Sequence, residues 1–170
     1  MVEIRRLDAR QAREHAGALA AVLVDCVEGG ASISFMDPLS HDDAAAFFSG
    51  VADDVEAGRK ILLGAFDDDE LVGTVQVLLA MPPNQPHRGD IKKLLVHRAA
   101  RHHGIGAALM ARAEAEAKAR GRTLLVLDTA SGDAERLYAR GGWQRVGVIP
   151  DYAMWPGGGF CDTTVFWKRV

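Results

Sequence analysis

Arg101, His102 and His103 stand directly before Gly104-Ile105-Gly106, so three residues that can carry positive charge precede two glycines. This turn separates an apolar run at residues 91–96 from a helix-forming run at residues 107–120. A glycine turn that enters a helix exposes unpaired backbone N–H groups at the positive end of the helix dipole, where phosphate oxygens bind. The turn therefore predicts a pyrophosphate site. Arg101 would add charge to it, and its backbone donors would be His102, His103, Gly104, Ile105, Gly106 and Ala107.

Two other kinds of nucleotide-binding site also contain a glycine turn. No G-x-x-x-x-G-K-[ST] pattern occurs in the chain, which excludes a P-loop. A Rossmann NAD site would use Gly104 and Gly106 for the pyrophosphate and Asp128 for the ribose. However, Leu109 occupies its third small position, and the glycines do not follow the strand directly. An NAD oxidoreductase therefore stays the less favoured alternative.

Two sequence blocks together resemble the GNAT acetyltransferase superfamily. Arg101-x-x-Gly104-x-Gly106 has the [RQ]-x-x-G-x-[GA] form of its acyl-CoA loop. Downstream, Ala134-x-x-Leu137-Tyr138-x-x-x-Gly142-Trp143 is similar to its A-x-x-L-Y-x-x-x-G-[FW] block. Several shorter sequence segments resemble the tabtoxin-resistance branch of this superfamily, whose enzymes acetylate an amine on a β-lactam amino acid toxin. These segments are Gly29-Gly30-Ala31-Ser32, Phe35-Met36, Lys93-Leu94, Leu127-Asp128-Thr129 and Arg145-Val146-Gly147.

The pattern of apolar residues and turn signals predicts one α/β (mixed α+β) domain over residues 1–170. The resemblance implies a GNAT-like twisted mixed sheet of six to seven strands with four helices and a splayed central parallel pair. Asp8 is the expected N-cap of the first helix and Gly58 the expected end of the second. Expected strands are 2–7, 60–66, 71–80, 91–96, 123–127, 143–148 and 163–168, and expected helices are 9–27, 41–57, 107–120 and 134–139.

The resemblance implies an N-acetyltransferase that moves an acetyl group from acetyl-CoA to the amine of a small molecule, such as a toxin or an antibiotic-like amino acid. Direct transfer needs no enzyme nucleophile, and we expect Cys26 and Cys161 to be inert. Leu94, Leu95 and Val96 would pair with the pantetheine arm. A non-catalytic acyl-CoA-binding module is the second alternative.

Tyr138 is the expected acid and a cofactor contact, because the family's matching tyrosine protonates the departing thiolate; a core tyrosine is the alternative. Ser131 stands where many members carry a cofactor-contacting asparagine. Asp90 and Asp128 are both candidate bases, and for each the alternative is a carboxylate that caps a loop. They sit at different ends of their strands. The acceptor amine is expected near Phe35, Met36, Asp37, Tyr152 and Trp155.

Composition limits the partners. The chain has 20 basic and 23 acidic residues, so nothing favours nucleic acid. The N-terminus lacks a signal peptide's apolar core, and no apolar run is long enough to span a membrane. We therefore expect a cytoplasmic protein with no membrane contact.

The clustered His97, His102 and His103 have no carboxylate at ligand spacing, so we expect no metal. A homodimer is a further expectation.

Overall fold

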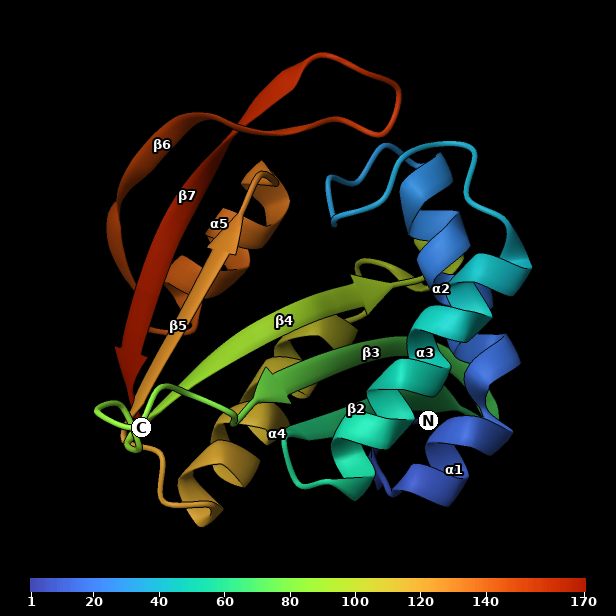
Figure 1. Ribbon diagram of the computed structural model, residues 1–170. Coiled ribbons are helices and arrows are strands. Elements are labelled where there is room, and N and C mark those ends of the chain that lie inside the picture. The colour runs from blue at the N-terminus through green and yellow to red at the C-terminus, as the bar shows by residue number, and fades with distance from the viewer.

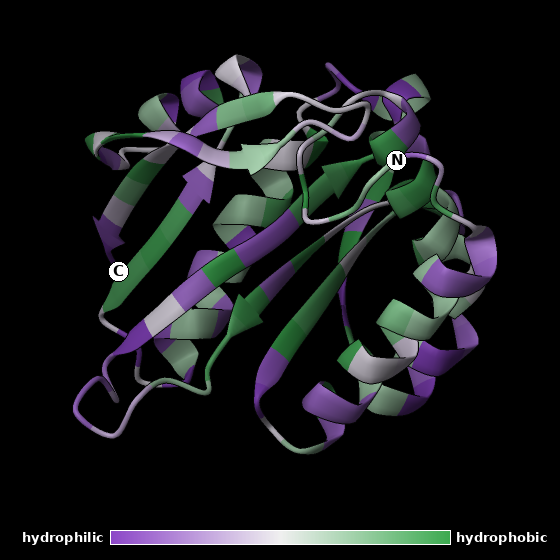
Figure 2. Ribbon diagram, turned by 45° about the horizontal axis from the view of Figure 1, so that its top comes forward, coloured by the Kyte–Doolittle hydropathy of each residue, from purple (hydrophilic) through white to green (hydrophobic).

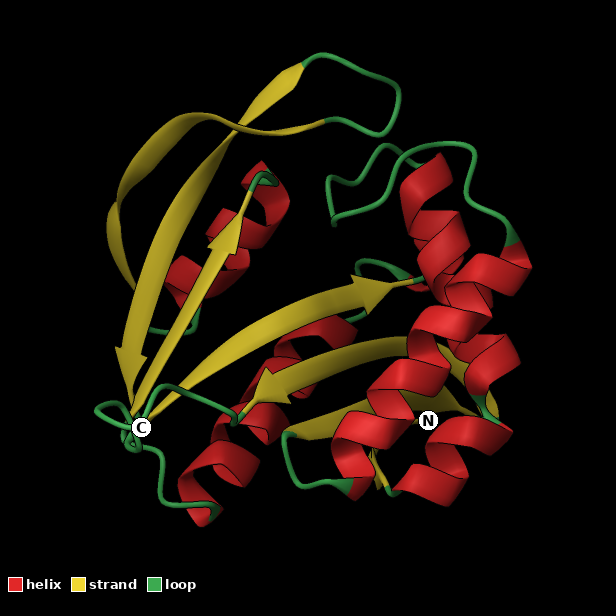
Figure 3. Ribbon diagram, in the orientation of Figure 1, coloured by secondary structure: helices red, strands yellow, loops and turns green.

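The computed structural model describes residues 1–170 (Figures 1 and 3). A single-turn 3₁₀ helix at Arg98–Ala100 follows the fourth strand. The remaining elements, in chain order, are β1 (Val2–Leu7), α1 (Ala9–Glu14), α2 (Ala16–Glu28), α3 (His41–Glu56), β2 (Lys60–Asp67), β3 (Glu70–Leu78), β4 (Arg88–Val96), α4 (Ile105–Ala119), β5 (Leu124–Thr129), α5 (Gly132–Arg140), β6 (Gln144–Met154) and β7 (Phe160–Arg169).

The seven strands form one sheet in the order β1-β2-β3-β4-β5-β7-β6. Every neighbouring pair is antiparallel except β4 and β5, which are parallel. These two strands pair only where Arg88–Asp90 lies beside Leu124–Val126, and beyond that point they separate (Figure 1). The predicted mixed sheet with a splayed central parallel pair is confirmed. The doubly wound parallel sheet that a Rossmann enzyme needs is absent, so the NAD alternative is wrong.

Both faces of the sheet are covered by helices, and β2 shows why. Successive side chains of a strand point to opposite faces. Leu62 and Phe66 pack with α1, α2 and α3, whereas Ile61 and Leu63 pack with α4 on the other face. All four are buried, so this strand is apolar along almost its whole length (Figure 2). The two cores fix the sheet at the place where β4 and β5 separate.

Local signals set several element ends. The Asp8 side chain accepts a hydrogen bond from Gln11 N, and the Gln11 side chain accepts one from Asp8 N, which is a capping box. Gly58 has a φ of +71° after α3, a conformation that favours glycine at a helix end. The predicted roles of Asp8 and Gly58 are confirmed.

Two predicted element ranges are wrong in detail. The helix expected over residues 9–27 is broken at His15, so the protein has five α-helices rather than four. The His15 ring packs edge-on against Phe66 with centroids 5.1 Å apart, a tertiary contact that the local sequence does not reveal. β6 extends well past residue 148. It contains Pro150, which a sheet tolerates at its edge because no partner there needs the missing N–H.

None of the helices combines the length and the apolar character that crossing a membrane would need.

Candidate active site

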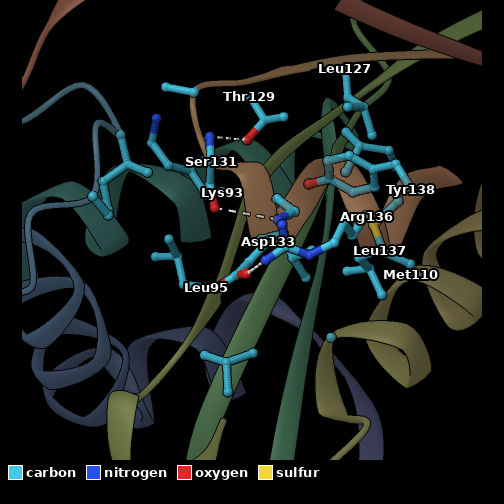
Figure 4. A pocket seen from close by; sticks show the side chains of 18 of the residues that line it. Lys93, Leu95, Met110, Leu127, Thr129, Ser131, Asp133, Arg136, Leu137 and Tyr138 are labelled. Carbon is cyan, nitrogen blue, oxygen red and sulfur yellow. Dashed lines mark hydrogen bonds and ion pairs between the residues drawn. The ribbon is translucent and has the colours of Figure 1, made fainter. Parts of the chain in front are cut away.

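A cleft of about 1340 Å³ opens where β4 and β5 separate (Figure 4). Its walls come from five parts of the chain that are distant in sequence. They are the loop at residues 29–34, the end of β4 at residues 91–96, the turn and first residues of α4, the segment from Leu127 through Tyr138, and Tyr152 and Trp155 of the β6–β7 hairpin. The split in the sheet therefore creates the cavity, and the motifs found in the sequence surround it.

The glycine turn forms one end of this cleft. Gly104 is the N-cap of α4 with a φ of +77°, and a Cβ placed on it would meet no atom within 4 Å. Gly106 instead lies close to α5, because a Cβ there would be 3.3 Å from Leu137 Cδ2. The first helical hydrogen bond runs from Ala108 N to Gly104 O at 3.0 Å, and the N–H groups of residues 102–107 have no acceptor in the protein. The turn thus presents six consecutive free donors.

Arg101 lines the cleft, but contacts with β4 and α2 hold its side chain in place. Its Nε donates to Val96 O at 3.0 Å, and one terminal nitrogen lies 3.5 Å from Cys26 Sγ. Burial raises the pKa of Cys26, so this thiol stays protonated and unreactive near neutral pH. His102 lines the cleft with a φ of +66°, whereas His103 does not line it. Of the three expected cations, two therefore face the ligand space.

A β-bulge shapes the edge of β4. Thr74 pairs with Leu95 and Gln76 with Lys92, so Lys93 and Leu94 together lie opposite the single residue between them on β3. Lys93 has a φ of +52°. Beyond Asp90 the side of β4 that faces β5 has no strand partner. Leu94, Leu95 and Val96 line the cleft along this unpaired edge, where an amide-rich chain can add like a strand.

Tyr138 lies on the opposite wall, on α5. Its ring packs against Trp143 and Phe166 with centroid distances of 6.0 and 5.7 Å, and the residue is only 5% exposed. The hydroxyl makes no hydrogen bond within the protein and points into the cleft (Figure 4). Burial, with a smaller contribution from Asp128, raises the pKa of Tyr138 above its ordinary value of 10, so the phenol is protonated at neutral pH.

The two candidate carboxylates are in different surroundings. Asp128 lines the cleft, its Oδ2 accepts a hydrogen bond from Thr163 Oγ1 at 2.8 Å, and its Oδ1 is 3.8 Å from Lys92 Nζ. Asp90 pairs with Val126, two residues before Asp128 on β5, and does not line the cleft. Its nearest ionic partner is Arg88, 3.5 Å away. Of these two carboxylates, only Asp128 lines the cavity with Tyr138.

Ser131 is the N-cap of α5, a role that we did not predict. Its Oγ accepts from Ala134 N at 3.3 Å, and its own N–H donates to Thr129 Oγ1 at 3.1 Å (Figure 4). The residue still lines the cleft. A serine three residues before Ala134 is itself an N-cap signal that could have shown this role.

The loop after α2 is held to the β6–β7 hairpin by two hydrogen bonds. Ser32 Oγ donates to Met154 O at 2.9 Å, and Asp37 N donates to Pro156 O at 3.0 Å. Figure 1 shows the loop after α2 beside this hairpin. Tyr152 and Trp155, which we predicted to lie near the acceptor amine, line the cleft.

Phe35, Met36 and Asp37 lie in the same loop but do not line the cleft. Phe35 packs edge-on against Phe47 at 5.2 Å, and Met36 and Asp37 are exposed. Lys93 is a charged cleft residue that we did not predict as a site residue from the sequence. Its special backbone arises from the pairing with β3, and no local signal in residues 91–96 reveals it.

The family model for the acetyltransferase (GNAT) family matches residues 31–143. This range contains the glycine turn, the unpaired edge of β4 and the Tyr138 block. The chain belongs to the GNAT acetyltransferase family.

Solved structures share this GNAT fold at low sequence identity. An N-acetyltransferase from Staphylococcus aureus Mu50 is 19% identical with a TM-score of 0.82, and the match covers 99% of this chain and 98% of that one. The ribosomal-protein-alanine N-acetyltransferase of Brucella melitensis is 21% identical with a TM-score of 0.82 and 99% coverage of both chains. A phosphinothricin acetyltransferase from Sinorhizobium meliloti, solved with acetyl-CoA, is 17% identical with a TM-score of 0.79, covering 99% of this chain and 88% of that one. Acetyl-CoA, the cosubstrate expected from the sequence, is the acyl donor of this family.

Proposed function

We propose that residues 1–170 act as one N-acetyltransferase domain that transfers the acetyl group of acetyl-CoA directly to the amine of a small molecule. The observation that carries this proposal is the pairing of two features across one cleft. Six free amide donors lie at the mouth of α4, and the unpartnered Tyr138 hydroxyl lies on the facing wall. Neither feature alone identifies a transferase, but together they supply a diphosphate site and an acid.

The N–H groups of residues 102–107 would hold the diphosphate of coenzyme A. Charge-assisted hydrogen bonds from backbone amides at a helix N-terminus are a common way to bind phosphate. Gly104 leaves open space where the phosphates would lie, since a Cβ there meets no protein atom. Arg101 adds positive charge, although its hydrogen bond to Val96 O keeps it close to the strand.

The unpaired edge of β4 would receive the pantetheine arm. Its amide groups need partners when they leave water, and the edge of β4 beyond Asp90, which has no partner strand on the side of β5, can supply them. This edge and the glycine turn line the same cleft, so the two halves of the cofactor site would adjoin.

Acetyl-CoA supplies an activated thioester carbonyl, and the side chains of the cleft move the protons. Asp128 would accept the proton of the acceptor amine, directly or through water, because, of the two candidate bases, it is the one that lines the cavity with Tyr138. Tyr138 would donate its proton to the departing sulfur. A general acid or base of this kind typically contributes about 10²–10⁴-fold in rate.

We propose a small-molecule acceptor, with the tabtoxin-resistance branch as the finer assignment. The short matching segments at residues 29–32, 127–129 and 145–147 support that branch, and an enzyme named for phosphinothricin shares the fold. A relative named for a ribosomal protein shares it equally well, so an acceptor panel has to include peptide N-termini. A cytoplasmic homodimer remains part of this proposal.

The test begins with thermal unfolding in coenzyme A, acetyl-CoA, NAD and ATP. A ligand at a hundred times its Kd stabilises a protein by about 2.7 kcal/mol. At this chain length that stabilisation raises the Tm by about 5–11 °C. We expect this rise with coenzyme A and acetyl-CoA and none with NAD. An amine panel followed by mass spectrometry then separates an enzyme from a non-catalytic binding module, because only the enzyme yields an acetylated product.

A further inference from the structure

Lys93 is a cation in the cleft for which the protein supplies no carboxylate. Its Nζ donates to Ser34 Oγ at 2.8 Å and lies 6.0 Å from the centre of the Phe35 ring. No Asp or Glu oxygen lies within 4.0 Å of it, whereas the adjacent Lys92 has Asp128 at 3.8 Å. The mechanism proposed above does not use Lys93.

The backbone places Lys93 in the cleft through an uncommon conformation. Neighbouring strand residues normally point to opposite faces, but Lys93 is itself a residue of the bulge, where this alternation is broken, and both Lys92 and Lys93 line the cavity. A φ of +52° is unfavourable for a side chain longer than asparagine. Two other residues of the cleft that are not glycine, Ser34 and His102, also have positive φ. Strain of this type persists where the surroundings impose it, and it gathers at ligand sites.

The electrostatic setting keeps this ammonium short of negative charge. The pKa of Lys93 is lowered from 10.5 to about 8, first by burial and then by the charges of Lys92 and Lys60, while Asp128 opposes the shift. At neutral pH the side chain is therefore still mostly protonated, so it would be a poor base. A partly buried ammonium with neutral partners alone is stabilised when an anion enters the cavity.

The surroundings of the Nζ place that anion on the acceptor side. Ser34 and Phe35 belong to the loop that is pinned to the β6–β7 hairpin. Tyr138, which would serve the departing sulfur, comes from α5 on another wall (Figure 4). The amine would lie between Asp128 and Tyr138, and a second group of the acceptor would reach Lys93.

We propose that Lys93 binds an oxyanion of the acceptor, so that the enzyme selects amines that also carry a carboxylate or a similar acid. This inference rests on the proposed acetyltransferase function and names the residue that sets its specificity. The ammonium and the Ser34 hydroxyl would contact the two oxygens of the acid, while Asp128 faces the amine.

The test compares wild-type enzyme with Lys93→Met, which keeps the length but not the charge, and with Lys93→Arg, which keeps the charge. Lys118→Met is the matched control, because Lys118 is exposed on α4 and has no ion pair. The acceptors are L-amino acids, each beside its carboxamide. We expect Lys93→Met to raise KM for the carboxylate forms by about ten- to a hundredfold. The KM values for the carboxamides and for acetyl-CoA should not change, Lys93→Arg should retain part of the preference, and Lys118→Met should match wild type.

Equal use of acids and carboxamides by the wild type, or an equal effect of Lys93→Met on both, would overturn the inference and leave the acetyltransferase standing. A rise in the KM for acetyl-CoA would assign Lys93 to the cofactor instead and would also overturn it. If the wild-type protein neither binds acetyl-CoA nor forms an acetylated product with any acceptor, the proposed function itself is contradicted.

A second measurement does not depend on turnover. Wild-type protein is reductively methylated with isotopic formaldehyde, a neutral reagent that releases no carboxylate, and mass spectrometry follows Lys93 and Lys118 separately. Acetate should slow the labelling of Lys93 several-fold and acetamide should not, with Lys118 unaffected by either. Equal labelling rates of Lys93 in the two solutions would refute an oxyanion site even if no panel amine is acetylated.

Discussion

Replacing Gly104 with alanine separates backbone strain from ligand contact, because the chain contains a matched glycine. Gly104 and Gly121 have φ values of +77° and +74°, and a Cβ at either would meet no protein atom within 4 Å. Only Gly104 lines the cleft. Alanine in this conformation costs about 1–2 kcal/mol, so each variant should lose about 2–8 °C in Tm.

Coenzyme A binding should distinguish the two variants. At Gly104 the added methyl group would occupy the space next to the free amides, so the diphosphate would lose at least one charge-assisted hydrogen bond. Such a bond is worth about 1.5–3 kcal/mol, or about ten- to a hundredfold in Kd. We therefore expect weaker coenzyme A binding to Gly104→Ala by this factor and unchanged binding to Gly121→Ala.

Isothermal titration calorimetry with coenzyme A, and with pantetheine as a ligand without the diphosphate, measures the difference. Pantetheine should bind both variants equally. Equal coenzyme A affinity of Gly104→Ala and Gly121→Ala, at equal loss of Tm, would refute the placement of the diphosphate at this turn.

Three further changes test the chemistry of the cleft. Tyr138→Phe should lower kcat by about 10²–10⁴-fold, yet change stability by less than about 0.5 kcal/mol because the hydroxyl has no partner, and a kcat within a few-fold of wild type would remove Tyr138 as the acid. Asp128→Asn should reduce kcat by about 10²-fold or more with acetyl-CoA binding retained, whereas Asp90→Asn should change kcat only a few-fold; the reverse order would make Asp90 the base. The pKa of Lys93 is lowered from 10.5 to about 8 because the folded protein disfavours its ammonium form. The charged side chain therefore destabilises the fold below pH 8, and this penalty disappears as the pH rises from about 8 to about 10.5. Lys93→Met should therefore raise the Tm at pH 7 by an amount that shrinks over that range, and a gain that does not vary with pH would contradict the shift.

The resemblance to the GNAT family predicted the mixed sheet with its splayed parallel pair, and local chemistry predicted the glycine turn at the start of α4. Gly104 needs a left-handed backbone, and the free amides after it follow from the geometry of any helix start. The run at residues 91–96 predicts a strand whatever its partner is, and Ile91 and Leu95 in it are buried. These features were readable without knowledge of the partners of each residue.

The rest depends on contacts between distant residues. The bulge that turns Lys93 into the cleft is defined by pairing with β3, and nothing in the run IKKLLV shows it. The break at His15 accompanies a contact with Phe66, and β6 continues through Pro150 because it is an edge strand. Asp90 and Asp128 could not be separated from the sequence, since only the register of β4 against β5 shows which of them passes the split.

A crystal structure of the protein with bound coenzyme A would test the central claim most directly. The account predicts diphosphate oxygens about 2.7–3.2 Å from backbone nitrogens within residues 102–107, with the pantetheine arm along residues 94–96. Coenzyme A bound elsewhere, with the amides of residues 102–107 far from any phosphate oxygen, would contradict it.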